Sequence, residues 1–281
     1  MQAATPSRTA LRVALRRAAH QLYDAPPLVL DDPIAVKILG HDYAEDLRRT
    51  PQRPDRPYSI GLRAFLVARS RYAEDLLAAA VAHGVTQYVL LGAGLDTFAH
   101  RNPHPHLRVF EVDHPATQAW KRELLLKNNL PAPKNLTYAP IDFEHHTLGE
   151  QLRSAGFDAT APAFFAWLGV VPYLTLPAFR ATVAWIASLP RGTGVVLDYG
   201  QPRHALPPLE QLSHDSLTSR VAQAGEPFHL FFTPPEIAAE LHAFSTIEDM
   251  GSQEINARYF ARRTDALKLL GTAGRLLSAR L

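Results

Sequence analysis

A glycine turn between two predicted strands constrains the fold of this chain more than any other feature. The apolar run 88–91 predicts a short buried strand, and Gly92 and Gly94 follow it directly. Because glycine has no Cβ, such a turn can bend sharply and lie close to a ligand. We expect a helix after the turn and a second strand at 109–113, which ends in the carboxylate of Asp113. This order of elements is typical of the nucleotide-binding half of a doubly wound sheet.

The residues after the glycines narrow the choice of nucleotide. A dinucleotide fingerprint has a third glycine where this chain has Thr97, and its pyrophosphate binds at the start of the following helix. Asp96 places a carboxylate in the turn, and a carboxylate repels a pyrophosphate. A cofactor with a nucleoside and no phosphate, such as S-adenosylmethionine, meets no such repulsion. The turn therefore favours a methyltransferase, and a nicotinamide-dependent oxidoreductase stays open as the alternative enzyme.

The rest of the chain alternates predicted strands and helices, which favours a mainly parallel sheet with helices on both faces. We expect a long helix over 59–83 and a helical tail over 262–281. Beyond the two strands already named, the apolar stretches predict strands at 136–141, 163–167, 194–198, 245–249 and 254–257. The predicted fold is α/β: a doubly wound, mainly parallel, seven-stranded Rossmann-like sheet with an N-terminal helical section and an inserted cap.

Two segments stand outside this alternation. Residues 1–60 have a helical period up to about Tyr23 and then a loop rich in proline and arginine, so we expect an N-terminal helical cap section there. The main domain is expected over 61–281. Within it, the segment 201–232 carries four prolines and three histidines and is too long for a simple connection. We interpret it as an inserted lid over the substrate, with a passive surface excursion as the alternative.

Composition excludes several other classes of protein. The 281 residues include 29 basic and 27 acidic side chains, so no electrostatic footprint for nucleic acid is visible. The absence of cysteine excludes disulfides, thiol catalysis and thiolate metal sites, and we expect a cytoplasmic protein. The uncharged stretch 159–179 is interrupted by three prolines, so we expect a strand and a loop rather than a membrane span. The histidine pairs at 104–106 and 145–146 lack an acidic partner at ligand spacing, so we expect no metal.

Several short motifs follow one another in a fixed order. They are RSRYAED at 69–75, LGAGLDT at 91–97, FEVDHP at 110–115, DF at 142–143, FAWLGVVPYLT at 165–175 and NARYF at 256–260. In these motifs the chain resembles the bacterial branch of the leucine carboxyl methyltransferase family. The resemblance implies a class I methyltransferase that uses S-adenosylmethionine and typically methylates oxygen. We expect a small organic acceptor with a carboxylate or a hydroxyl, in a monomer or a homodimer.

The resemblance also implies a role for each matched residue. Arg69 resembles the arginine that binds the cofactor's carboxylate, with Arg63 as a possible helper. Asp113 is expected to accept both ribose hydroxyls, because a carboxylate offers two oxygens. Asp142 is expected to accept the adenine amino group, with Phe143 beside the ring. The cofactor-binding residues implied in this way are Arg63, Arg69, Gly92, Ala93, Gly94, Asp96, Asp113, His114, Asp142, Phe143 and Leu168.

One residue departs from the family pattern. Many relatives carry a glutamate at the position of Leu168, and leucine cannot pair with the cofactor's ammonium group. A protein that binds S-adenosylmethionine without catalysis, as a regulatory module, is therefore a further alternative.

The catalytic residues depend on the acceptor. A carboxylate acceptor needs no base at neutral pH, whereas a hydroxyl is helped by one, usually histidine. The segment 201–232 offers His204, His214 and His229, of which we name His204 as the catalytic candidate. Tyr173 and Tyr199 follow strand ends and are expected to border the substrate.

Overall fold

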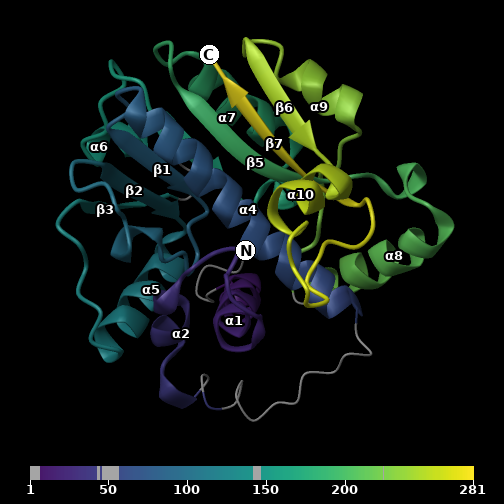
Figure 1. Ribbon diagram of the computed structural model, residues 1–281. Coiled ribbons are helices and arrows are strands. Elements are labelled where there is room, and N and C mark those ends of the chain that lie inside the picture. The colour runs from purple at the N-terminus through teal and green to yellow at the C-terminus, as the bar shows by residue number, and fades with distance from the viewer. Residues whose placement is uncertain (1–6, 43–44, 46–56, 142–146, 224) are drawn as a thin grey trace.

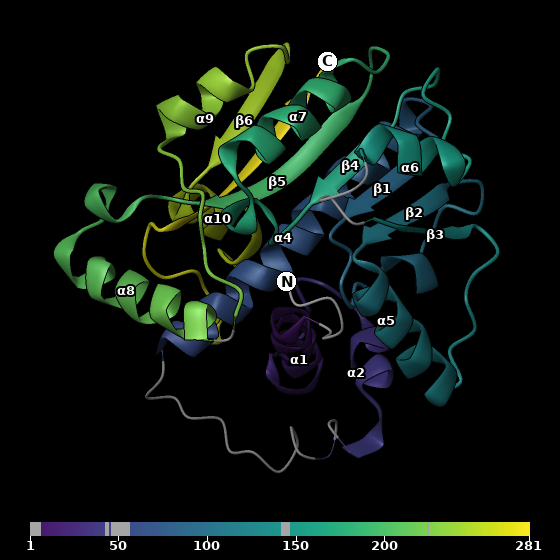
Figure 2. The same cartoon turned by 180° about the vertical axis from the view of Figure 1, so that it is seen from behind.

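The computed structural model places one twisted sheet between two layers of helices (Figures 1 and 2). It describes residues 7–42, 45, 57–141, 147–223 and 225–281. The strands are β1 (Gln87–Leu91), β2 (Arg108–Asp113), β3 (Leu136–Pro140), β4 (Phe164–Trp167), β5 (Gly194–Gly200), β6 (Thr246–Met250) and β7 (Gly274–Arg280). The α-helices are α1 (Arg8–Tyr23), α2 (Pro33–Leu39), α4 (Pro57–Ala82), α5 (Pro115–Lys127), α6 (Leu148–Ser154), α7 (Leu176–Ala187), α8 (Pro208–Gln223), α9 (Pro234–Glu240) and α10 (Ser252–Tyr259). Short 3-10 helices are η1 (Phe98–His100), η2 (Val171–Tyr173) and η3 (Arg203–Ala205).

The seven strands lie in the order β3-β2-β1-β4-β5-β7-β6. Strands β3, β2, β1, β4 and β5 run parallel, and β7 runs antiparallel to both β5 and β6. The predicted doubly wound, mainly parallel seven-stranded sheet is confirmed. The strand order reverses between β1 and β4, and a crevice for ligands forms outside the carboxyl ends of the strands at such a point.

The sheet separates two hydrophobic cores because successive side chains of a strand point to opposite faces. Val89 and Leu91 of β1 pack into a core with helices α6, α7 and α9. Tyr88 and Leu90 pack into the core on the other face, which α4 and α10 cover. Figure 1 shows α4 crossing one face, and Figure 2 shows α6, α7 and α9 over the other. All five residues of β1 are buried, as expected of a central strand covered on both sides.

Three elements differ from the sequence prediction. The expected strand 254–257 lies inside helix α10, where Glu254 accepts the N–H of Gly251 and caps the helix. The expected helical tail instead forms β7, which pairs with β5 and β6 and buries Leu276 and Leu277. Its leucine- and arginine-rich sequence favours a helix, but two neighbouring strands satisfy its backbone and outweigh that local preference.

The third difference lies after the glycine turn. The expected helix there is only η1, a 3-10 helix of three residues. The side chain of Asp96 accepts the N–H of Phe98, and Lys121 donates to the carbonyl oxygen of Asp96 at 2.6 Å. The carbonyl that would start an α-helix is therefore bound by a side chain.

The segment 201–232 contains η3 and the helix α8, followed by an irregular stretch that returns to the sheet. In the described ranges, no helix is both long enough and apolar enough to cross a membrane.

Candidate active site

A cleft of about 570 Å³ lies at the carboxyl ends of β1, β2, β3 and β4. Its floor is formed by the loops after these strands, and its roof by helix α1 and the segment 225–229. The residues that line it are Ser7, Thr9, Ala10, Val13, Ala14, Arg17, Arg69, Ser70, Leu90–Asp96, Asp113, His114, Thr117, Ile141, Ala166–Val170, Tyr173, Leu174, Ala178, Thr182, Gly225–Pro227 and His229. The volume is that of a pocket for a cofactor or another small organic molecule.

The glycine turn is packed closely from two sides. Gly92 has a φ of +69°, and a Cβ on it would lie 2.3 Å from Cγ2 of Val170 in the loop after β4. A Cβ on Gly94 would lie 3.2 Å from the Cβ of Ala10 in helix α1. Glycine is therefore required at position 92 for backbone conformation and for space. The turn can approach a ligand only because neither residue has a side chain.

Asp113 lies at the end of β2 beside this turn. Its Oδ2 accepts the N–H of Gly94 at 2.5 Å, and its Oδ1 accepts the N–H of His114 at 2.7 Å. Burial raises the pKa of Asp113, while these two backbone hydrogen bonds favour the charged form. The carboxylate is held in one orientation, with remaining lone pairs for hydroxyl donors of a ligand.

Asp96 is held by helix α1. Arg17 donates to Asp96 at 2.7 Å, and it also binds Asp32 at 2.7 Å and Thr97 at 3.0 Å. Burial alone would raise the pKa of Asp96, but the positive charges of Arg17 and Lys121 lower it to about 2. Arg17 compensates the negative charge of Asp96. The repulsion between this carboxylate and a pyrophosphate is therefore weaker than the sequence of the turn alone suggests.

At the other end of the cleft, Arg69 of helix α4 lies beneath the loop after β4. Its Nη1 lies 3.0 Å from Oδ2 of Asp198, and both side chains are less than a tenth exposed. The other oxygen of Asp198 accepts the N–H of Gly169. Gly169 has a φ of +72°, and a Cβ there would lie 2.8 Å from Nη2 of Arg69. Asp198 therefore fixes both the guanidinium and the loop that covers it.

The roof of the cleft carries further polar groups. Glu226 accepts hydrogen bonds from the backbone N–H and the hydroxyl of Thr9, which joins the segment 225–229 to helix α1. The backbone N–H of His229 donates to the carbonyl of Pro172 in η2 at 2.7 Å. Burial raises the pKa of Tyr173, whose ring packs against that of Phe228 at 5.0 Å.

The structure brings most of the sequence-predicted residues into this cleft. Arg69, Gly92, Ala93, Gly94, Asp96, Asp113, His114, Leu168 and Tyr173 all line it. Asp142 and Phe143 lie outside the described residues.

Three predicted site residues do not line the cleft. The guanidinium of Arg63 binds the carboxylate of Asp24, with Nη2 at 2.7 Å from Oδ1. His204 lies exposed in η3. Tyr199 is 2% exposed and donates to Asp249 at 2.7 Å, and burial together with this carboxylate raises its pKa. Tyr199 points away from the cleft because side chains alternate along β5, where Asp198 faces Arg69.

The residues predicted from the sequence to form the site include none from helix α1, although this helix forms one of its walls. Ala10, Val13, Ala14 and Arg17 lie three or four residues apart, which places them on one face of the helix. Small residues on that face allow close approach to the glycine turn, and the single arginine reaches its acid. The sequence shows this spacing, but it does not show that this face of the helix packs against the glycine turn.

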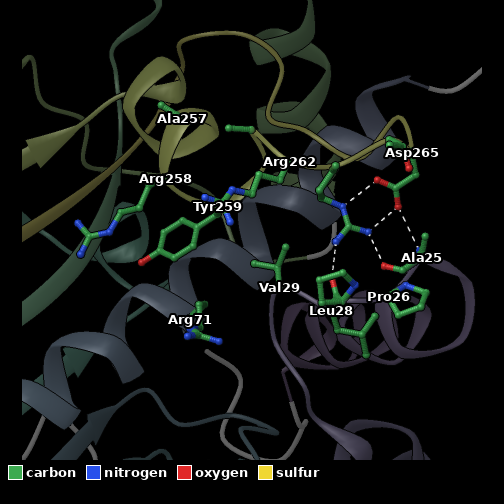
Figure 3. Close-up of a pocket in the computed structure, with 14 residues that line it drawn as sticks. Ala25, Pro26, Leu28, Val29, Arg71, Ala257, Arg258, Tyr259, Arg262 and Asp265 are labelled. Carbon is green, nitrogen blue, oxygen red and sulfur yellow. Dashed lines mark hydrogen bonds and ion pairs between the residues drawn. The ribbon is translucent and has the colours of Figure 1, made fainter.

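A second hollow of about 690 Å³ lies on the outer side of α4, between the loop 25–29 and the segment 257–265 (Figure 3). It lies away from the carboxyl ends of the parallel strands. Arg263 there pairs with Asp265 and donates to the carbonyls of Ala25 and Pro27 at 2.8 Å. Arg71 pairs with Asp75 on the same helix. These charges hold the chain's own loops together, so we place the active site in the cleft.

Comparison with known proteins identifies the family. The sequence model of the leucine carboxyl methyltransferase family matches residues 10–187, which is more than half of the chain. The chain belongs to the leucine carboxyl methyltransferase family. The matched range runs from helix α1 to the end of α7 and contains the glycine turn, Asp113 and Arg69.

Individual relatives agree with this assignment. The YktD protein of Bacillus subtilis (strain 168), named as a candidate S-adenosyl-L-methionine-dependent methyltransferase, is 32% identical over 291 aligned positions that cover 95% of each protein. A crystal structure of a candidate methyltransferase from Thermobifida fusca YX superposes with a TM-score of 0.59 at 18% identity, over 95% of this chain and 93% of that one. A DUF574 family protein from Streptomyces avermitilis MA-4680 has a TM-score of 0.52 at 16% identity, over 94% and 96%. At these identities the two structures show the shared fold.

S-adenosylmethionine is the cofactor of this methyltransferase, and the cleft fits it. Arg69 lines the cleft, and Gly169 leaves free the space beside its guanidinium that a Cβ would fill. Asp113, at the end of β2, offers a fixed carboxylate to the ribose hydroxyls, and β1 lies between β2 and β4 in the sheet. Since η1 replaces an α-helix after the turn, no α-helix N-terminus is available there for a pyrophosphate.

Proposed function

We propose that this protein transfers a methyl group from S-adenosylmethionine to an oxygen atom of a small organic acceptor. The observation that carries the proposal is one cleft with a buried guanidinium at one end and a fixed carboxylate at the other. Arg69 matches the cofactor's carboxylate, and Asp113 matches its ribose hydroxyls. A carboxylate or a hydroxyl of the acceptor is the expected nucleophile.

The protein's main task in such a reaction is alignment. When bound, the cofactor supplies a methyl group that is already activated by positively charged sulfur. Arg69 and Asp113 fix the two ends of the cofactor, and Asp198 holds Arg69 in place. Helix α1 and the segment 225–229 cover the cleft and reduce the access of water. Holding two reactants in line in this way accounts for a large part of catalysis.

Binding of the cofactor is the first test. We would titrate the protein with S-adenosylmethionine and S-adenosylhomocysteine by calorimetry, with NAD as the control ligand. We expect both to bind, Asp113→Ala to lose that binding, and Asp215→Ala, at an exposed ion pair with Arg203, to retain it. Binding of NAD alone would favour the oxidoreductase alternative and overturn the proposal.

Transfer to oxygen is the second test. The protein would be incubated with cofactor that carries a deuterated methyl group and with a panel of phenols, alcohols and carboxylic acids. Mass spectrometry of the products would locate the label, and we expect it on oxygen. Cofactor binding without labelled product from any compound would favour the non-catalytic alternative, which the position of Leu168 suggests.

A further inference from the structure

We propose that Glu226, in the roof of the cleft, binds the ammonium group of the cofactor's methionine part. This inference rests on the proposed function and extends it, since Arg69 and Asp113 account for the carboxylate and the ribose hydroxyls but not for the ammonium group. It is carried by the hydrogen bonds that orient the Glu226 side chain and by the charges that act on its neighbour Tyr173.

The ammonium group of the cofactor needs a hydrogen-bond acceptor within the cleft. It is attached to the same carbon atom as the carboxylate, so a carboxylate bound at Arg69 brings a positive charge to the same end of the cleft. Taking that charge out of water without a partner is unfavourable. The start of the loop after β4 offers no side-chain acceptor, because Leu168, Gly169 and Val170 line the cleft there.

The carboxylates that line the cleft, within the described ranges, are Asp96, Asp113 and Glu226. Two of them belong to the glycine turn and its surroundings. Asp96 lies in the turn and is bound by Arg17, and Asp113 accepts the N–H of Gly94 in the turn. Glu226 is the carboxylate that lies in the roof instead.

Asp198 is the acid nearest to Arg69, but it is not available to the ammonium group. One of its oxygens pairs with Arg69, and the other accepts the N–H of Gly169. It is also absent from the lining of the cleft. The acceptor for the ammonium group is therefore sought in the roof.

Helix α1 orients the side chain of Glu226. Its Oε2 accepts the hydroxyl of Thr9 and also the backbone N–H of Thr9, the latter at 3.3 Å. Among the described residues, no group donates to Oε1 and no cation pairs with this carboxylate. Glu226 is half-buried and lines the cleft. One oxygen thus fixes the side chain, and the other can accept a proton of an ammonium group.

Tyr173 relates Glu226 to the Arg69 end of the cleft. Burial raises the pKa of Tyr173, and its hydrogen bond with Thr9 opposes this rise. The charges of Glu226, Arg69 and Asp198 also shift the pKa of the same hydroxyl. Charges act strongly only over short distances, so Glu226 and Arg69 both lie near this one side chain. An amino acid whose carboxylate is bound at Arg69 therefore has Glu226 at its own end of the cleft.

Analogues of S-adenosylhomocysteine isolate the contribution of the ammonium group. S-adenosylhomocysteine has no charge on sulfur, so its affinity contains no attraction between Glu226 and a sulfonium. We would titrate the protein by calorimetry with this compound, with its deaminated analogue and with its decarboxylated analogue. We expect the wild type to bind S-adenosylhomocysteine about tenfold more tightly than the deaminated analogue, the value of a hydrogen bond between charged groups at a half-buried site.

The variant Glu226→Gln removes the charge and keeps an oxygen for Thr9. We expect it to weaken S-adenosylhomocysteine and the decarboxylated analogue about tenfold and to leave the deaminated analogue unchanged. Asp215→Asn is the matched control, because it removes one negative charge from the segment 201–232 at an exposed ion pair outside the cleft. It should bind all three ligands as the wild type does. An undiminished preference of Glu226→Gln for the ligand with the ammonium group would overturn the proposal.

A purely structural role of Glu226 predicts a different result. If this carboxylate only held the roof to helix α1, its loss would weaken all three ligands by the same factor, and that result would also overturn the proposal. Thr9→Val removes one donor to the same carboxylate and leaves its charge in place. We expect Thr9→Val to weaken S-adenosylhomocysteine and the deaminated analogue equally, in contrast to Glu226→Gln.

Failure of this inference can be distinguished from failure of the proposed function. If the wild type binds S-adenosylhomocysteine and its deaminated analogue equally well, the role of Glu226 is refuted and the proposed function stands. If the wild type binds none of these ligands, the proposed function itself is refuted.

Discussion

Arg17 in helix α1 and Asp96 in the glycine turn form an ion pair of 2.7 Å across 79 residues of sequence. Arg17 is 5% exposed and Asp96 is 17% exposed at the side chain. The same guanidinium also binds Asp32, just before helix α2. One arginine therefore binds the N-terminal section to the glycine turn. The position of helix α1, which forms part of the roof of the cleft, depends on this contact.

Replacing Asp96 by asparagine should destabilise the protein. We expect Asp96→Asn to lower the free energy of unfolding at pH 7 by about 3 kcal/mol, because it leaves part of the buried charge of Arg17 without a partner. The pKa of Asp96 is lowered to about 2, so its contribution is present above pH 4 and is lost as the pH falls towards 2. The wild type and the variant should therefore converge between pH 4 and pH 2.

Urea unfolding at several pH values measures this difference. Asp215→Asn, which breaks an exposed ion pair with Arg203, serves as the control and should change stability little at any pH. A difference between Asp96→Asn and the wild type that stays constant down to pH 2 would contradict the assigned role of the carboxylate.

Arg69 should recognise the amino-acid end of the cofactor and not its nucleoside. We expect Arg69→Ala to weaken S-adenosylmethionine binding by about 10- to 100-fold, the value of a hydrogen-bonded charged pair. Binding of 5′-methylthioadenosine, which lacks the carboxylate, should stay unchanged in the same variant. Calorimetry with both ligands gives the ratio, and Arg71→Ala on the exposed side of the same helix is the control. Equal weakening of both ligands would argue for a general structural role.

Gly92 should tolerate no side chain. Gly92→Ala combines a positive φ of +69° with a clash against Val170, so we expect it to lower the free energy of unfolding by about 3 kcal/mol. Gly84 also has a positive φ, of +94°, but nothing lies within 4 Å of its hypothetical Cβ. We expect Gly84→Ala to cost only about 1 kcal/mol. Thermal unfolding of the two variants separates the cost of the positive φ from the cost of the steric clash. Similar losses of stability in both variants would refute the predicted clash with Val170.

Tyr199 should contribute to stability and not to methyl transfer. Its hydroxyl donates to Asp249, and its raised pKa keeps it protonated. We expect Tyr199→Phe to cost about 1 kcal/mol of stability and to leave kcat unchanged. Steady-state kinetics on any accepted substrate, beside a urea titration, gives both values. A tenfold fall in kcat would contradict this prediction and indicate that Tyr199 takes part in methyl transfer.

Short-range patterns in the sequence predicted the parallel strands of the sheet and the floor of the cleft. The glycine turn, the acid at the end of β2 and the alternation of strands and helices each depend on residues that are neighbours in the chain. Such patterns predict elements well because backbone conformation and the burial of a strand are local properties. They predicted Gly92, Gly94 and Asp113 at one edge of the sheet, the resemblance to the family added Arg69, and all four line the cleft.

Contacts across long stretches of sequence decided the rest. The leucine-rich tail forms β7 because β5 and β6 offer it hydrogen bonds that a local preference for helix cannot match. Tyr199 and His204 lie only a few residues from Asp198, yet neither lines the cleft. Strand alternation turns Tyr199 to the other face of the sheet, and His204 lies in the exposed η3. Helix α1, Asp198, Glu226 and His229 belong to the cleft only through partners far along the chain. The sequence by itself determined the floor of the site, and tertiary packing decided its roof, because only packing brings charges on distant segments together.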